Sequence, residues 1–300
     1  MRQIAGALFA TAGFFAASCG ARAEMDWSAV DAAVGRKAMV SGPVHKYGLP
    51  RTDLHVTLDG VSVKPGLALG GWVAFEPIVE PMGRGAAMMG DLVLTESEVG
   101  PVMRALLDGG VGVTGVHNHL LRASPATFYM HVAGEGDPAS LARIVRDALA
   151  QSKTPLEAAA PAGGEPPKLD FDAAKIDRIL GFQGKNNGGI YQFSIPRAEP
   201  VQARGMTVAP AMGTAISLNF QPTGEGRAAI SGDFVALGRE VEPLLKALQS
   251  NGIEVTALHN HMLDDEPRLF FVHFWANDDA AKLAKGLRAG LDVLHHAGHS

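Results

Sequence analysis

The chain contains the same stretch of sequence twice, and this repeat limits the possible folds more than any other feature. An offset of 142 residues aligns two copies of a His-Asn-His motif, each followed 12 residues later by another histidine. The repeated histidines are His117, His119 and His131 in the first copy and His259, His261 and His273 in the second. Upstream of the motif the offset becomes 145, so one turn differs in length between the copies. The repeat predicts two related units in tandem.

Four segments follow from the limits of the repeat. Residues 1–23 read as a signal peptide, residues 24–150 and 169–300 hold the two repeats, and residues 151–168 form a linker rich in Ala, Pro and Gly. The linker lacks apolar periodicity, so we expect it to be exposed.

Each repeat has a readable order of helices and strands. In the second, apolar residues at helical spacing end at Asn251-Gly252, two β-rich stretches follow over 253–262 and 269–275, and a further amphipathic helix follows these. The first repeat shows the same order. This pattern predicts an α+β fold: two tandem repeats, each a mainly antiparallel sheet with helices on one face, packed with pseudo-two-fold symmetry.

The predicted hairpin brings the three histidines of each repeat together. In a strand, residues i and i+2 share a face, so both histidines of a His-Asn-His motif point the same way. A register with an even index sum, for example His117 opposite His131 or His259 opposite His273, places the third ring on that face as well. A slip of one residue would place it on the other face.

Three neutral imidazoles with an open fourth position suit Zn²⁺ or copper, and two such sets allow one or two ions. The six repeated histidines are therefore the predicted metal ligands. Near the second set, Asp264 and Glu266 are the predicted catalytic carboxylates if the metal activates a water molecule. The alternative to a metal site is that these histidines only form structural hydrogen bonds. The sequence also leaves open whether the two sets make one shared site or two separate sites.

Other side chains offer weaker sites. Met88, Met89 and Met262 are soft donors suited to copper, although methionine more often fills gaps in a core. Trp72 and Trp275 are candidates for stacking a glycan or peptide in a cleft between the repeats.

Composition limits the partners and the compartment. The formal net charge is -5, from 26 basic and 31 acidic side chains, and no basic stripe suits nucleic acid. The uncharged stretch from Ile4 to Ala17, followed by the small-residue signal Ala21-Arg22-Ala23, predicts export to the periplasm or beyond, and at about 14 residues it is too short to span a bilayer. No segment of the mature chain is predicted to cross a membrane. The single cysteine, Cys19, is an alternative site for a lipid anchor, which would make the protein a membrane-anchored lipoprotein.

The segments 114–121 with 129–132, and 256–263 with 267–275, resemble the LppY/LpqO family of secreted or lipid-anchored bacterial proteins. The resemblance covers nearly the whole mature chain. It implies export and a duplicated domain, but it supplies no reaction.

Taken together, these features predict an exported metal-binding protein. Two alternatives are a metal-dependent hydrolase acting on a cell-envelope or small-molecule substrate, and a metal-free module that binds a glycan or peptide.

Overall fold

The computed structural model describes residues 25–80, 83–157, 164 and 166–298. The predicted signal peptide, Cys19 and part of the predicted linker lie outside these residues. Among the described helices, none combines the length and the apolar character that crossing a membrane requires.

Two six-stranded sheets, antiparallel throughout, form the centre of the molecule. In sheet order, the first contains β1 (Met39–Ser41), β2 (Val44–Pro50), β5 (Gly70–Glu80), β6 (Gly83–Thr95), β8 (Thr127–Gly136) and β7 (Gly112–Asn118). The second contains, in the same spatial order, β9 (Lys185–Asn187), β10 (Ile190–Ile195), β13 (Ile216–Gly224), β14 (Arg227–Leu237), β16 (Leu269–Asp279) and β15 (Glu254–His259).

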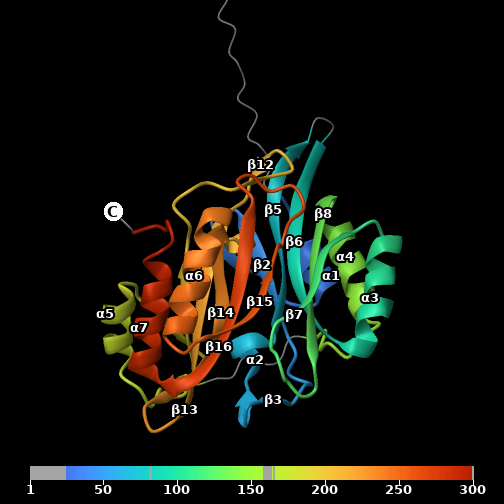
Figure 1. Cartoon of the computed structure of the whole chain (residues 1–300). Coiled ribbons are helices and arrows are strands. Elements are labelled where there is room, and N and C mark those ends of the chain that lie inside the picture. Colours follow the sequence, from blue (N-terminus) through green and yellow to red (C-terminus); the bar gives the residue numbers. More distant parts are fainter. Residues whose placement is uncertain (1–24, 81–82, 158–163, 165, 299–300) are drawn as a thin grey trace, which may run out of the picture.

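Helices cover the outer face of each sheet, so the molecule has four layers in the order helices, sheet, sheet, helices (Figure 1). The first sheet carries α1 (Ser28–Val34), α3 (Glu96–Asp108) and α4 (Pro138–Leu149). The second carries α5 (Ala173–Leu180), α6 (Gly238–Ser250) and α7 (Ala280–Leu291). The amphipathic pattern of β6 explains the layering, because Leu92 and Leu94 pack under the helices while Val93 packs between the sheets.

A short insertion follows the second strand of each repeat. In the first repeat it contains β3 (Val56–Leu58), β4 (Val61–Val63) and α2 (Pro65–Ala68). In the second it contains β11 (Gln202–Ala203), β12 (Met206–Thr207) and the 3₁₀ helix η1 (Pro210–Met212). With these insertions, every element of one repeat has a counterpart in the other. The predicted α+β fold with two repeats related by a pseudo-two-fold axis is confirmed.

A buried arginine anchors the start of the third helix in each repeat. Arg51 is fully buried and donates two hydrogen bonds to Glu98, whose carboxylate also accepts from the backbone N–H of Thr95 at the start of α3. Arg197 and Glu240 repeat the arrangement at α6. Because both charges of each pair are buried and hydrogen-bonded, the pair fixes the angle at which the helix leaves its sheet.

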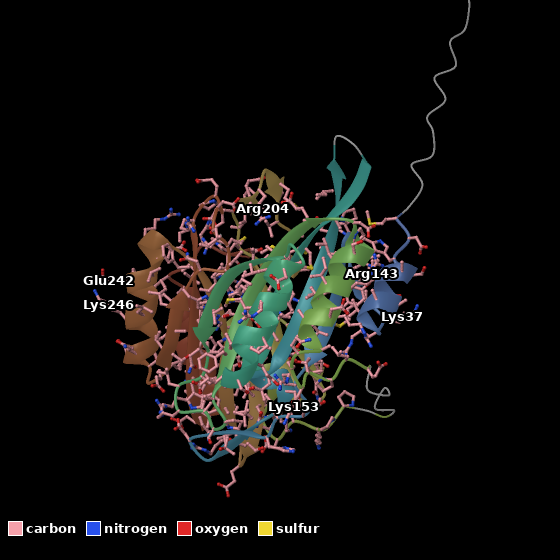
Figure 2. All side chains as sticks on the ribbon, turned by 90° about the vertical axis from the view of Figure 1, so that its right-hand side faces the viewer. Lys37, Arg143, Lys153, Arg204, Glu242 and Lys246 are labelled. Atoms are coloured by element: carbon pink, nitrogen blue, oxygen red, sulfur yellow. The ribbon has the colours of Figure 1, made fainter. Side chains whose placement is uncertain are left out.

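Charged side chains lie on the outer helices, as the amphipathic patterns require. Figure 2 shows Glu242 and Lys246 on one side of the molecule and Lys37 and Arg143 on the other. The buried polar side chains of the repeated motif lie instead in the layer between the sheets.

Candidate metal centre

All six repeated histidines converge at the middle of the layer between the sheets. The edge strands β7 and β15 lie side by side there, each next to the strand that carries the third histidine of its repeat (Figure 1). The two sets therefore form one cluster shared by the repeats, which the sequence left open.

A β-bulge places the three rings of each repeat on a common face. At the start of β7, Val113 pairs with Val132, and continuing this register would place His131 on the opposite face from His117. Thr114 is an extra residue, after which His117 pairs with Tyr129, so His117 and His131 share a face. The bulge at Thr256 does the same in the second repeat. The structure therefore meets the even-sum condition, with His117 opposite Tyr129 and His259 opposite Phe271, two residues away from the example pairs with His131 and His273.

Within each repeat, the first motif histidine reaches the hairpin histidine. The Nε2 atoms of His117 and His131 are 2.9 Å apart, and those of His259 and His273 are 2.7 Å apart. A hydrogen bond between two such nitrogens needs one N–H and one lone pair. In each pair, one Nε2 must therefore donate the hydrogen bond and the other must accept it.

Between the repeats, the second motif histidine crosses to the partner set. His119 of the first repeat contacts His273 of the second, and the rings of His261 and His131 lie 3.9 Å apart between centroids. His117 and His259 stack on each other with 3.6 Å between ring centroids, next to the pseudo-two-fold axis. The histidines of each repeat therefore contact those of the other repeat, and the six rings form a single cluster.

The bulged threonines fasten this crossing. The hydroxyl of Thr114 donates to the carbonyl of His261 at 2.6 Å, and the hydroxyl of Thr256 donates to the carbonyl of His119 at 2.8 Å. The same residue that corrects the register of one repeat thus holds the backbone of the other repeat's histidine.

Two aspartates complete the cluster. Asp91 on β6 pairs with His131 across the sheet, and its Oδ1 lies 3.8 Å from the Nδ1 of that ring. Asp233 on β14 pairs with His273 and contacts its ring, and it also lies 3.8 Å from Nε2 of His119. Each repeat therefore supplies three imidazoles and one carboxylate.

Burial keeps the rings neutral. It lowers the pKa of all six imidazoles below the usual 6.5, and for His259 to about 4. Burial and the nearby charge of Asp233 raise the pKa of Asp91 well above its usual range, while the Lys46 ammonium acts in the opposite direction. Burial also lowers the pKa of Lys46 itself to about 8. Neutral imidazoles have the free lone pairs that a metal ion requires.

Three groups of donor atoms lie close enough to bind an ion. In each group the donor atoms are within 4.8 Å of one another. The groups are His117 with His259 and His273, His131 with His259 and His261, and His119 with Asp233 and His273. Every group takes ligands from both repeats.

Several donor atoms of the cluster lack partners among the described residues. Oδ1 of Asp91, Nδ1 of His119 and Nε2 of His261 are buried without a hydrogen bond. Each such atom costs about 1–3 kcal/mol in lost hydration. His117 and His259 are half-buried, so they are the most exposed of the six histidines.

The two predicted catalytic carboxylates lie outside this cluster. Glu266 is exposed, and its backbone pairs with Gln202; Asp264 is exposed and lines a pocket beside Met262. Between them Asp265 is buried and accepts a hydrogen bond from the backbone N–H of Leu269. A catalytic role for Glu266 or Asp264 stays a prediction.

The carboxylates that do reach the histidines, Asp91 and Asp233, are not among the predicted site residues. They occupy equivalent positions in the repeat alignment, so a signal for them existed. The sequence alone does not show that these aspartates lie beside the histidines, because that depends on the strand order, which places β6 beside β8 and β14 beside β16.

Comparisons with known proteins identify a family without naming an activity. One family model matches the chain twice, over residues 28–151 and 174–293, and it is described as Domain of Unknown Function (DUF1259). A search of curated proteins finds no match. The resemblance to the LppY/LpqO family stays a prediction, because neither result bears on it.

Two solved structures show a weak likeness. A trimeric bacterial microcompartment shell protein, PduB, has 13% identity over 86% of this chain and 91% of that chain, with a TM-score of 0.21. EtuB from Clostridium kluyveri has 9% identity over the same shares, with a TM-score of 0.20. At these TM-scores the likeness carries no argument about fold or function.

Proposed function

The chain belongs to the Domain of Unknown Function (DUF1259) family, and we propose from its own geometry that it is an exported protein that binds Zn²⁺ or copper. One observation carries the proposal: the two repeats together assemble three overlapping groups of histidine and aspartate donors. The apolar stretch before residue 24 supports export, with lipid attachment at Cys19 as the alternative route to the cell envelope.

The chemistry of the donors favours these ions. Imidazole nitrogen suits Zn²⁺ and copper, whereas Mg²⁺ and Ca²⁺ prefer oxygen ligands. A tetrahedral Zn²⁺ with nitrogen ligands at about 2.0 Å holds those nitrogens about 3.3 Å apart. The Nε2 atoms of the histidine pairs lie 2.9 and 2.7 Å apart, so small movements of the rings would bring them to the distance that the ion requires. Bound metal would also give a partner to buried rings of the cluster, such as His119 and His261, that each have a nitrogen without a partner among the described residues.

Overlap among the groups limits how many ions bind together. His259 belongs to two groups and His273 to two, and a neutral imidazole has a free lone pair on only one of its two nitrogens. The cluster therefore suits one ion at the axis or two ions on either side of it. Both arrangements draw ligands from both repeats.

Metal content of the protein tests the proposal. We expect at least one ion of Zn²⁺ or copper per chain after reconstitution and removal of excess metal. His259→Ala, which removes a ligand from two of the three groups, should weaken binding by at least about 100-fold. His295→Ala is a matched control, because His295 is exposed and pairs with Glu199 outside the cluster. Equal metal binding by the two variants would contradict the proposal.

A metal-dependent hydrolase is the second candidate, favoured by the partial exposure of His117 and His259, the least buried histidines of the cluster. A bound ion there would polarise a water molecule or a substrate carbonyl. A screen of ester, amide and glycoside substrates, with and without chelator, separates an enzyme from a carrier. Turnover that chelation abolishes and metal restores is the result expected of an enzyme.

A metal-free glycan or peptide module has less support. Trp275 is buried, with its indole N–H donating to Asp59, and the Trp72 ring lies under the Lys46 ammonium at 3.8 Å. Burial removes Trp275 from contact with a sugar, and the Lys46 ammonium occupies one face of Trp72.

A further inference from the structure

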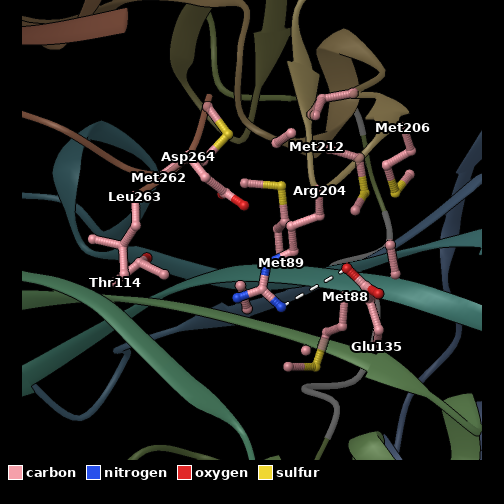
Figure 3. Close-up of a pocket in the computed structure, with 15 residues that line it drawn as sticks. Met88, Met89, Thr114, Glu135, Arg204, Met206, Met212, Met262, Leu263 and Asp264 are labelled. Atoms are coloured by element: carbon pink, nitrogen blue, oxygen red, sulfur yellow. Dashed lines mark ion pairs between the residues drawn. The ribbon is translucent and has the colours of Figure 1, made fainter. Parts of the chain in front are cut away.

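A pocket lined by methionines lies at one end of the layer between the sheets (Figure 3). It takes Met89 from the first sheet, Met206 and Met212 from the insertion of the second repeat, and Met262 from the loop after β15. Figure 3 shows the sulfurs of these four residues on one side of the Arg204–Glu135 ion pair. Met88 also lines the pocket, but its side chain belongs to the core beneath the helices of the first repeat.

This concentration of sulfur is local. Five of the chain's 11 methionines line this one pocket, where Met212 and Met262 lie at the edge of the hydrophobic core of the second repeat and Met89 packs against it. Here about 30 Å³ of free space remains, enough for an ion or one or two water molecules but not for a sugar or peptide.

The pseudo-symmetric position at the other end of the layer offers an internal comparison. At the repeat offsets of 142 and 145, the counterparts of Met206, Met212 and Met262 are Val61, Leu67 and Leu120. These three are buried in one apolar cluster together with Trp275, whose counterpart in the pocket is Ala133. The same scaffold is thus filled by aliphatic and aromatic groups at one end, and is hollow and lined with thioethers at the other.

The chemistry of the pocket selects its ligand. Thioether sulfur is a soft, uncharged donor that prefers Cu(I) to Zn²⁺ or Cu(II). The carboxylates of Glu135 and Asp264 also line the pocket, against the single cation of Arg204, so the lining carries a net negative charge. We propose that the pocket is a Cu(I) site built from the thioethers of Met89, Met206, Met212 and Met262.

This site is distinct from the histidine cluster but adjoins it. Thr114, which also lines the pocket, bonds the carbonyl of His261, and Met262 is the next residue in the chain. Met89 precedes Asp91 by two residues on β6, so both side chains project from the same face of the strand. The proposal goes beyond the histidine site and stands or fails on its own.

Competition for Cu(I) tests it. Anaerobic titration against bathocuproine disulfonate, with the full chain carrying Cys19→Ser in every sample, measures Cu(I) binding without a competing thiolate. Replacing all four methionines by leucine preserves side-chain volume and should cost less than about 1.5 kcal/mol of stability per site. We expect this variant to lose one equivalent of Cu(I) while its Zn²⁺ binding stays unchanged.

Two further samples separate the proposals. His259→Ala/His273→Ala should retain the Cu(I) equivalent that the methionine variant loses. If that double variant does not fold, the wild-type chain loaded with Cu(I) should show sulfur neighbours in X-ray absorption spectra. Equal Cu(I) binding by the wild type and the methionine variant would overturn the copper site, as would a spectrum with nitrogen neighbours alone. Absence of Zn²⁺ binding would instead count against the histidine site only.

Discussion

The two repeats are alike at the centre of the layer between the sheets and differ at its ends. At the centre, histidine faces histidine, each aspartate lies beside the histidine ring opposite it in the sheet, and each bulged threonine bonds the other repeat. At the ends the repeats differ, with Trp275 filling one end and Ala133 leaving the other open. Near the axis a side chain touches its own counterpart or a neighbour of it, so a change in one repeat disturbs both. Farther from the axis each repeat can change alone.

The largest expected effect lies at the filled end. Trp275→Ala removes a buried indole from the cluster that also contains Leu67 and Leu120, and the other end shows what remains when alanine occupies this position. We expect a loss of about 3–5 kcal/mol in the free energy of unfolding, measured with urea. Met206→Ala removes a large side chain at the hollow end for comparison, and because Met206 is only half-buried it should cost no more than about 1 kcal/mol. Equal costs would remove the distinction between the ends.

The centre is expected to respond to acid. In the unfolded chain an imidazole takes up a proton near pH 6.5, but burial holds the pKa of the folded His259 at about 4. Between these pH values the unfolded state binds more protons than the folded state. The contribution of His259 to the free energy of unfolding is therefore complete above about pH 6.5 and decreases as the pH falls. His259 alone predicts a loss of about 2 kcal/mol between pH 6.5 and about pH 5. Urea unfolding of the metal-free protein measures it, and a constant stability over this range would show that the rings are not held neutral.

The smallest effect tests the symmetry of the centre. Thr114→Val and Thr256→Val each remove one hydroxyl bond to a histidine carbonyl of the other repeat. Each should cost about 1 kcal/mol in the free energy of unfolding, and the two costs should agree within about 0.5 kcal/mol. A clear cost in one repeat and none in the other would show that only one side of the crossing is fastened.

Much of this architecture follows from the sequence. Periodicity and the offset between the His-Asn-His motifs predict two α+β units, and the period of a strand predicts that His117 and His119 share a face. Because the parity of the register decides where His131 points, an even index sum was the required condition, and the structure meets it.

The rest depends on contacts that no local pattern encodes. Nothing in the spacing shows that Thr114 is bulged, since a bulge is defined only by the partner strand. The approach of His119 to His273 depends on how two sheets pack, and the part played by Asp91 depends on which strand lies beside β8. The methionine pocket is harder still to anticipate, because it owes its space to the absence of a tryptophan at Ala133.

The central claim is that the two repeats share one metal centre, and the stoichiometry of His259→Ala/His273→Ala tests it most directly. These two residues, both from the second repeat, contribute to all three donor groups. Zn²⁺ bound per folded chain, measured by elemental analysis beside the wild type, should fall to the background of the buffer. A variant that is folded and keeps half of the wild-type Zn²⁺ would contradict the account, because the first repeat would then bind metal alone.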